Sequence, residues 1–424
     1  AVRRIDRGPR RTRAVAEGER RAHRASQVDV PHAARIEKMD GEHDRVHRGA
    51  VDLVVDERSA RGSVRVVRAQ PPPDDSQEPS ARGRQVLDDL EADLLGELTA
   101  PTRSGASIEP ADFDETLTRL GRLLPRSVHL GTSSWYFPGW RDLVWRGDTD
   151  YTESRLARCG LSAYARHPLF RCVGIDRTFY QPLTVAEYAS YADQVPNDFR
   201  FVVKAPAMVT DAAMRGKRGD PVELNPLFLD PSAAIDHFVR PAIEGLSHRA
   251  GPLLFQLSPL PGDMKSADGG IGTIERIGTL LSALPVSIGG IAPIYAVELR
   301  DTELLTPRFV RTLRECGARL CIALHPRMPV AARQSAALRA MDALDEEGDD
   351  WRLKGPLVVR WNLAGGLRYE EARTRYAPFD RLVDPDIPTR GTLAHLIHVA
   401  IKSHQRSFVV ANNKAAGSEQ LTLI

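Results

Sequence analysis

Several short apolar runs beyond residue 125 end in ionisable side chains. Glu298 ends the run Tyr-Ala-Val-Glu, His325 follows Cys-Ile-Ala-Leu, and Lys204 ends Phe-Val-Val-Lys. A glutamate that stays ionised beside cations can accept a proton, and an imidazole exchanges one near pH 7. We therefore expect Glu298 and His325 to move protons, with Asp176 and Lys204 completing the set of catalytic residues.

The polar residues near the same run ends predict a site that binds an anion. Their cations outnumber their carboxylates: Lys204, Arg300, Arg360 and Lys414 against Asp176 and Glu298. A guanidinium fork suits a carboxylate or a phosphate. The expected substrate-binding residues are Thr132, Ser134, Trp135, Thr178, Tyr180, Gln256, Arg300, Arg360, Asn362, Asn412 and Lys414. Because alternate residues of a strand point the same way, Ser133 and Gln181 are expected to face away from this set.

Three sharper mechanisms and the role of the aromatic residues stay open. Asp176, Glu298 and His325 form an alternative metal site, although cations compete nearby, so no metal is assigned and the cofactor is left unknown. Lys204 becomes a Schiff-base lysine if burial depresses its pKa. A nucleophilic role for Ser134 lacks a Gly-x-Ser-x-Gly elbow and a partner. Trp135 and Tyr180 either pack as core and lid residues or offer a stacking surface to a ligand.

The elements that must position these residues alternate between apolar strands and amphipathic helices. Eight runs predict strands: 128–132, 173–178, 201–204, 253–257, 295–299, 320–324, 357–360 and 408–411. Between them, Thr184 with Glu187 is a capping-box pattern, and Thr306-Pro307 up to Gly317 predicts a helix with both ends marked. Helices are also predicted over 331–347 and 391–404, and a long loop over the active face at 211–230.

This alternation predicts an α/β fold, a TIM (β/α)8-type barrel preceded by a disordered N-terminal segment. A doubly wound open sheet is the alternative, disfavoured because no glycine fingerprint follows the first strand.

Several motifs in the same order resemble the DUF72 (YecE-like) family of uncharacterised TIM-barrel-like proteins. The clearest are Gly-Thr-Ser-Ser-Trp at 131–135, Thr-Phe-Tyr at 178–180, Val-Glu-Leu-Arg at 297–300 and Asn-Asn-Lys at 412–414. The resemblance spans residues 126–424 and implies a barrel over that domain. Many relatives resemble Val-Glu-Ile-Asn-Ser-Thr-Phe-Tyr-Arg at the second strand, where this chain has Gly174, Asp176, Arg177 and Gln181. Roles that rest on the missing glutamate and final arginine therefore do not carry over.

Residues 1–110 differ from the rest in composition. The first aromatic residue is Phe113, and residues 1–84 hold 18 Arg and one Lys against 14 acidic residues. A segment without large apolar side chains cannot offset its ordering entropy, so we expect a disordered tail. Two alternatives are a miscalled gene start and an arginine-rich segment that binds nucleic acid through phosphates.

These patterns favour an enzyme that uses acid/base chemistry on a small anionic, phosphorylated or sugar-like substrate. The alternatives are a barrel that binds or processes nucleic acid, with a salt-dependent affinity, and a barrel that binds a ligand or partner without catalysis. No apolar run reaches the length of a membrane span, and the four cysteines form no CxxC pair. We expect buried, reduced thiols in a cytoplasmic protein that does not bind a membrane; the sequence does not identify a protein partner.

Overall fold

The described chain begins with a short segment that packs ahead of the first strand. The computed structural model describes residues 107–147, 150–215, 221–266, 270–342 and 351–423, so most of the predicted tail, residues 1–110, lies outside them. The structure describes only residues 107–110 of this predicted tail. There, Ile108 is buried and Pro110 forms a β-bridge with Trp145. Helix α2 (Glu115–Leu123) follows, and the Asp114 side chain caps it by accepting from the Leu117 backbone N–H.

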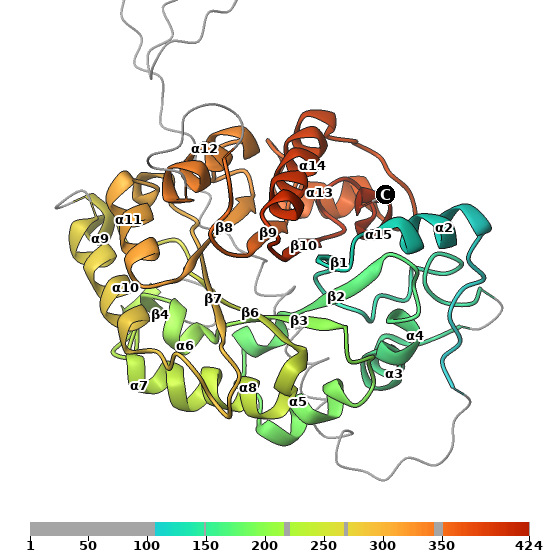
Figure 1. Ribbon diagram of the computed structural model, residues 1–424, viewed down its shortest axis with the longest axis horizontal. Helices are drawn as coiled ribbons and strands as arrows, with labels where there is room; N and C mark the ends of the chain where they lie inside the picture. The colour runs from blue at the N-terminus through green and yellow to red at the C-terminus, as the bar shows by residue number, and fades with distance from the viewer. Residues whose placement is uncertain (1–106, 148–149, 216–220, 267–269, 343–350, 424) are drawn as a thin grey trace, which may run out of the picture. The chain divides into compact units, whose positions relative to one another are not determined.

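Eight parallel strands close into a barrel, which confirms the predicted fold class (Figure 1). The strands are β1 (Val128–Thr132), β2 (Phe170–Ile175), β3 (Arg200–Lys204), β6 (Ala250–Gln256), β7 (Ile294–Glu298), β8 (Arg319–Leu324), β9 (Leu357–Trp361) and β10 (Ser407–Ala411). Their order around the barrel is β1-β10-β9-β8-β7-β6-β3-β2. Because β1 pairs with both β2 and β10, the sheet has no open edge, and the doubly wound alternative is wrong.

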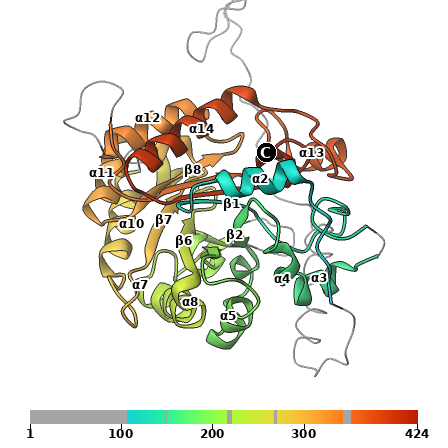
Figure 2. The ribbon, with the colours of Figure 1, turned by 45° about the vertical axis from the view of Figure 1, so that its right-hand side comes forward.

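Helices surround the barrel on its outer face (Figures 1 and 2). The α-helices after α2 are α3 (Glu153–Cys159), α4 (Leu161–Tyr164), α5 (Val185–Ala192), α6 (Ala207–Thr210), α7 (Pro231–Ala234), α8 (Arg240–Leu246), α9 (Gly262–Ser266), α10 (Ile271–Ala283), α11 (Pro307–Glu315), α12 (Ala331–Asp342), α13 (Tyr369–Tyr376), α14 (Ile387–Lys402) and α15 (Glu419–Leu423). Single turns are η1 (Arg177–Phe179), η3 (Ser247–Arg249) and η4 (Thr302–Leu304), and η2 (Ile235–Val239) is a π-helical turn.

The predicted helix signals act as expected. Thr184 and Glu187 form a capping box at the start of α5. Thr306 caps α11 and accepts from the Phe309 N–H, and Gly317 follows the helix at φ +69°, a left-handed conformation that glycine adopts without strain. Helix α12 starts where it was predicted, whereas the part of that prediction beyond residue 342 lies outside the described residues.

The segment 211–230 is not simply a loop, which corrects that prediction. It contains a small antiparallel sheet of β4 (Ala213–Arg215) and β5 (Pro221–Leu224). The Asn225 side chain ties the base of this small sheet to α6 and the residue after it, because its Nδ2 donates to the carbonyl oxygens of Met208 and Asp211 at 2.9 and 2.7 Å. The strands are too short to give a strand pattern in the sequence.

The two faces of the barrel strands pack into separate clusters. Residues such as Val173, Phe201 and Val359 belong to the large core between the sheet and the helices. Their neighbours point inward and form two small apolar groups inside the barrel: Cys172, Val202, Phe408 and Val410, and Leu254, Ala296, Cys321 and Val358. The next inward positions toward the C-terminal strand ends carry the charged residues, so a polar layer lies above an apolar filling.

The structure also bears on the predictions for the cysteines and for membrane-spanning segments. The expectation of buried cysteines holds for Cys172 and Cys321 but is wrong for Cys159, which is exposed, and for Cys316, which is half-buried. All four are free thiols. Among the helices of the described residues, none is both long and apolar enough to cross a membrane.

Candidate functional site

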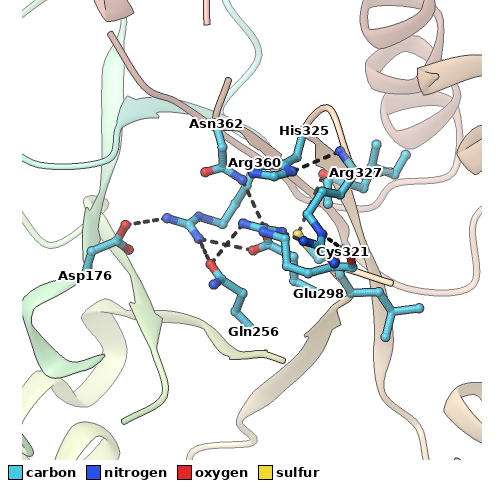
Figure 3. Close-up of polar contacts among 12 residues, drawn as sticks. Asp176, Gln256, Glu298, Cys321, His325, Arg327, Arg360 and Asn362 are labelled. Atoms are coloured by element: carbon cyan, nitrogen blue, oxygen red, sulfur yellow. Dashed lines mark hydrogen bonds and ion pairs between the residues drawn. The ribbon is translucent and has the colours of Figure 1, made fainter. Parts of the chain in front are cut away.

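A network of charged and amide side chains joins the C-terminal ends of β2, β6, β7 and β9 (Figure 3). Glu298 lies at its centre and is completely buried. Both of its oxygens are used: Oε1 pairs with Arg300 Nη1 and accepts from Asn362 Nδ2 at 3.0 Å, and Oε2 accepts from Arg360 Nη1 at 3.1 Å. The structure therefore brings Glu298, Arg300, Arg360 and Asn362 together, as expected for residues at the C-terminal ends of barrel strands.

Arg360 connects the network across the barrel. Its Nη1 also donates to Gln256 Oε1 at 2.8 Å, and its Nη2 is paired with Asp176 Oδ2. Gln256 Oε1 in turn accepts from Arg300 Nη2 at 3.1 Å. Both guanidinium groups thus donate to Glu298 and Gln256, and that of Arg360 also pairs with Asp176. Of these, only the Asp176 side chain is substantially exposed, at 37%.

Glu298 is held in its ionised form. Burial by itself would raise its pKa, but the charges of Arg300 and Arg360 and their hydrogen bonds outweigh burial and lower the pKa to about 2. The pKa of Arg360 is raised in turn. Burial by itself would lower it, but the carboxylates of Asp176 and Glu298 lie against the guanidinium and outweigh burial. At neutral pH the centre of the network is a fixed carboxylate between two fixed cations.

His325 lies at the edge of the same network, after β8. Its Nδ1 accepts from the Arg327 backbone N–H at 3.2 Å, so in the neutral ring the proton is on Nε2. Burial, followed by the positive charges of Arg300 and Arg327, lowers its pKa to about 3. The imidazole is therefore neutral near pH 7 and carries its proton on Nε2.

Lys204 ends β3 and is half-buried. Its Nζ lies 3.6 Å from the centroid of the Phe179 ring. Among the described residues, this Nζ takes part in no hydrogen bond and no ion pair. Burial lowers its pKa to about 8; Asp176 opposes this shift, and the charges of Arg360 and Arg300 add to it. Lys204 is thus the group in this network whose charge changes closest to neutral pH.

A second group of polar residues lies beside β10. Asn412 Nδ2 donates to Ser133 Oγ at 2.8 Å, and Asn412 Oδ1 accepts from Lys414 Nζ at 3.4 Å. The Lys414 ammonium lies 4.5 Å from the Tyr369 ring centroid and 5.9 Å from that of Phe379. Lys414 is half-buried and, among the residues that the structure describes, takes part in no ion pair.

The prediction of side-chain direction at β1 is wrong. Thr132 is buried on the helix side, where its Oγ1 lies 2.6 Å from the Tyr164 hydroxyl of α4, whereas Ser133 faces the interior and meets Asn412. The misleading residue is Gly131, which has no side chain to mark the inward face. The apolar side chains of Val128 and Leu130 were the usable signal in the sequence. The structure buries both under the helices, so the odd-numbered positions of β1 face the barrel interior.

Other predicted binding residues have structural contacts or lie at the rim. Trp135 is buried against Tyr191, and its Nε1 donates to the Ala157 carbonyl at 3.2 Å, so it packs as a core residue. Thr178 is buried in η1 rather than in a strand. Ser134 is half-buried, and Tyr180 is 48% exposed beside Phe179. Gln181 is exposed, as expected for a residue that faces away.

Sequence reasoning missed a second charged group next to the network. Asp301 is buried, accepts from the Leu260 N–H at 2.8 Å, and pairs with Lys265 at 3.0 Å and Arg327 at 3.6 Å. It follows Arg300 directly, but its partners come from helix α9 and from loops, which no strand pattern marks. Arg327 Nε also donates to the Arg300 carbonyl at 3.3 Å, which links this group to the network.

Within the described residues, no three His, Cys, Asp or Glu side chains are arranged to hold a metal ion. The missing second-strand glutamate also has a local explanation: a Cβ on Gly174 would lie 2.8 Å from the Ser133 carbonyl oxygen, so this backbone leaves no room for a side chain there.

Comparisons with known proteins identify the family. The model of the family described as "Protein of unknown function DUF72" matches residues 129–419. Among solved structures, a DUF72 family protein from Thermotoga maritima is 17% identical, with 70% of this chain and 95% of that chain covered and a TM-score of 0.45. One from Enterococcus faecalis is 15% identical, with 70% and 92% covered and a TM-score of 0.42. No curated protein matches. Since the family model matches well over half of the sequence, this chain belongs to the DUF72 family.

Proposed function

We propose that this protein is an enzyme that binds a small anionic substrate at the C-terminal end of its barrel and acts on it by acid/base chemistry. The observation that carries this proposal is the charge balance of the network. Arg300 and Arg360 are neutralised by Glu298 and Asp176, whereas Lys204 and Lys414 have no ion-pair partner among the described residues. Two unneutralised cations in partly buried positions attract an anion.

Lys204 is the better candidate for proton transfer. A general acid or base works best when its pKa lies near the working pH. Glu298, with a pKa of about 2, and His325, with a pKa of about 3, would each hold one protonation state throughout the neutral range. Lys204, with a pKa of about 8, exists in both forms there. In this proposal Glu298 therefore orients Arg300 and Arg360, and His325 offers a neutral N–H to the substrate.

The remaining network residues would then shape the binding site. Asp176 is the more exposed carboxylate and the one with the stronger effect on Lys204, so it is the natural partner for moving protons to and from that amine. Gln256, Asn362 and Asn412 hold neighbouring groups in place through their amides. Tyr180 offers an exposed ring at the rim.

The test is a search for turnover in a mixture of small phosphorylated and carboxylated metabolites, with substrate loss followed by mass spectrometry. Wild-type protein should consume at least one member, and Lys204→Met should reduce that rate about 10²–10⁴-fold. The control is Lys354→Met, since Lys354 is an exposed lysine ahead of β9 and should leave the rate unchanged.

Three other results would redirect the proposal. Inorganic phosphate that fails to raise the melting temperature at any concentration up to the millimolar range would argue against an anion site. Binding of several anions without any turnover would favour a barrel that binds without catalysis. Tight binding of a single-stranded oligonucleotide that weakens steeply with salt would favour the nucleic-acid alternative.

A further inference from the structure

We propose that Lys204 is a nucleophilic amine that forms an imine with the carbonyl group of a small anionic aldehyde or 2-oxo acid. This inference rests on the proposed function, since the anion site must first hold the substrate, and it narrows the substrate class and names a covalent step.

The backbone around Lys204 fixes the position of its amine. The Thr178 hydroxyl is within hydrogen-bond range of two carbonyl oxygens, those of Lys204 at 2.5 Å and Ile175 at 3.0 Å, so η1 is tied to the ends of both β2 and β3. This holds the Phe179 ring 3.6 Å from Lys204 Nζ. One side of the amine therefore meets an apolar ring face, and the side chain stays accessible from outside because Lys204 is only half-buried.

The contacts of Lys204 suit a nucleophile better than a structural cation. Buried lysines with structural roles are paired with carboxylates or carbonyl oxygens. Here the two carboxylates of the network are paired with arginines instead, Glu298 with Arg300 and Arg360, and Asp176 with Arg360. The amine of Lys204 is thus left with an unused lone pair whenever it is neutral.

The charge state of Lys204 supports this role. Burial lowers its pKa from 10.5 to about 8, with Asp176 opposing and the Arg360 and Arg300 charges adding to the effect. At pH 7 the neutral amine is then about 300-fold more abundant than for an ordinary lysine. The main cause is burial of the amine, and the two arginines that hold Glu298 add to it by keeping positive charge close to Lys204.

The step is balanced without an oxidant or a reductant. The Nζ lone pair attacks the carbonyl carbon, a C–N bond forms, and the carbonyl oxygen takes up a proton to give a carbinolamine. Loss of water then breaks the C–O bond and leaves the imine. In this proposal Asp176, the carboxylate whose charge acts most strongly on Lys204, carries the proton between nitrogen and oxygen. The protonated imine is again a cation over the Phe179 ring, which stabilises it as it does the ammonium.

The experiment traps the imine by reduction. The full chain is incubated at pH 7 with glyoxylate, the smallest anionic aldehyde, and cyanoborohydride, and carboxymethylated lysines are located by peptide mass spectrometry. Lys204 should be labelled at least about tenfold faster than the exposed Lys354 in the same molecule, since far more of its amine is neutral. Acetaldehyde has a similar size and no charge, so it should show a smaller preference: the advantage of the neutral amine remains, but the attraction of the anion site is lost. Inorganic phosphate should slow the labelling of Lys204 by glyoxylate.

Two variants and a binding measurement separate the possible outcomes. Lys204→Met should lose the label, and Lys204→Arg should lose it while phosphate still raises the melting temperature, because the positive charge remains. Labelling of Lys204 no faster than of Lys354, with phosphate binding intact, would overturn the covalent role and leave the proposed function standing. Absence of both phosphate binding and selective labelling would overturn the covalent role and the proposed function together.

Discussion

Buried arginines meet carboxylates in two regions of this barrel, and they are arranged differently. At the N-terminal end of β8, Arg319 and Asp342 form a closed pair: Nη1 donates to Oδ1 at 2.8 Å and Nη2 to Oδ2 at 2.6 Å. The rest of their capacity is used locally, since Arg319 Nε donates to the Pro356 carbonyl and Asp342 Oδ2 accepts from the Lys354 N–H. One cation meets one anion, and no charge is left over.

At the opposite end, the carboxylates of Glu298 and Asp176 are shared between Arg300 and Arg360, while Lys204 and Lys414 remain outside any ion pair of the described residues. A closed pair is sufficient to join α12 to β8. The open network holds more cations than its own anions can neutralise, and this excess is costly to keep near the interior unless a ligand uses it. If our proposal is right, the contrast separates an ion pair with a structural role from a network that prepares a binding site.

The largest effect is expected at the centre of the open network. Glu298→Gln removes the anion between two buried arginines and should lower the free energy of unfolding by about 3–5 kcal/mol. Urea denaturation measures this, with exposed Glu303→Gln as the control that should change stability by less than about 0.5 kcal/mol. The affinity for phosphate should fall in the folded variant, because Arg300 and Arg360 lose the carboxylate that orients them. An unchanged affinity would contradict the role given to Glu298.

The closed pair provides the matching experiment. Asp342→Asn leaves Arg319 buried without its counter-charge and should cost about 3 kcal/mol of unfolding free energy. The affinity for phosphate should stay the same, because Arg319 starts β8 at the end of the barrel opposite to the network. If the two variants shifted phosphate affinity alike, the distinction between a structural pair and a binding network would fail.

Acid should weaken the open network. The folded pKa of Glu298, about 2, lies below the ordinary value of 4.5, so its stabilising effect is present above about pH 4.5 and is lost as the pH falls to about 2. The loss should amount to about 3 kcal/mol across that interval. Denaturation of the wild type and of Glu298→Gln at several pH values checks this, since the difference between them should shrink toward pH 2. A constant difference would show that ionised Glu298 is not what stabilises the network.

Much of the architecture follows from local pattern. The eight runs rich in Val, Ile, Leu and Phe all become strands, and each predicted boundary lies within a few residues of the observed one, because β-branched and apolar runs of this length are buried on both faces of a parallel sheet. Glu298, Arg300, Arg360, Asn362, Gln256 and Asp176 meet because parallel strands bring their C-terminal ends to one side.

What could not be predicted depends on neighbours that are distant in the sequence. The pKa of His325 reflects burial and the approach of Arg300 and Arg327, and nothing near His325 in the sequence indicates that approach. The closeness of Phe179 to Lys204 depends on the turn η1, and the strand pattern had continued β2 through Thr178. The sequence thus indicated that the six residues of the network meet. It did not indicate the protonation states of the groups around them, because these depend on distances between side chains.

Alkaline pH should reveal Lys204 through its effect on stability. Its folded pKa, about 8, lies below the ordinary value of 10.5, so the unfolded chain binds more protons than the folded chain between these two pH values. The contribution of Lys204 to the unfolding free energy of the wild type therefore increases as the pH rises from about 8 to 10.5. Lys204→Met lacks this dependence. Its stability relative to the wild type should therefore fall by about 2 kcal/mol between pH 7 and pH 10, allowing for the partial exposure of the side chain. Lys354→Met is the control, and an equally steep change there would remove the special status of Lys204.

The smallest effect should come from Lys414, at the rim. Its ammonium is held by weak contacts, with Asn412 Oδ1 at 3.4 Å and the Tyr369 ring centroid at 4.5 Å, so Lys414→Gln should change the free energy of unfolding by less than about 0.5 kcal/mol. The variant still removes one of the two cations that lie outside the ion pairs. Phosphate affinity, measured by calorimetry at low salt, should fall about fivefold, roughly 1 kcal/mol, and the loss should shrink as salt screens the charge. Lys414→Arg should restore most of the affinity. An unchanged affinity in Lys414→Gln would limit the binding site to Lys204 and the two arginines and place β10 outside it.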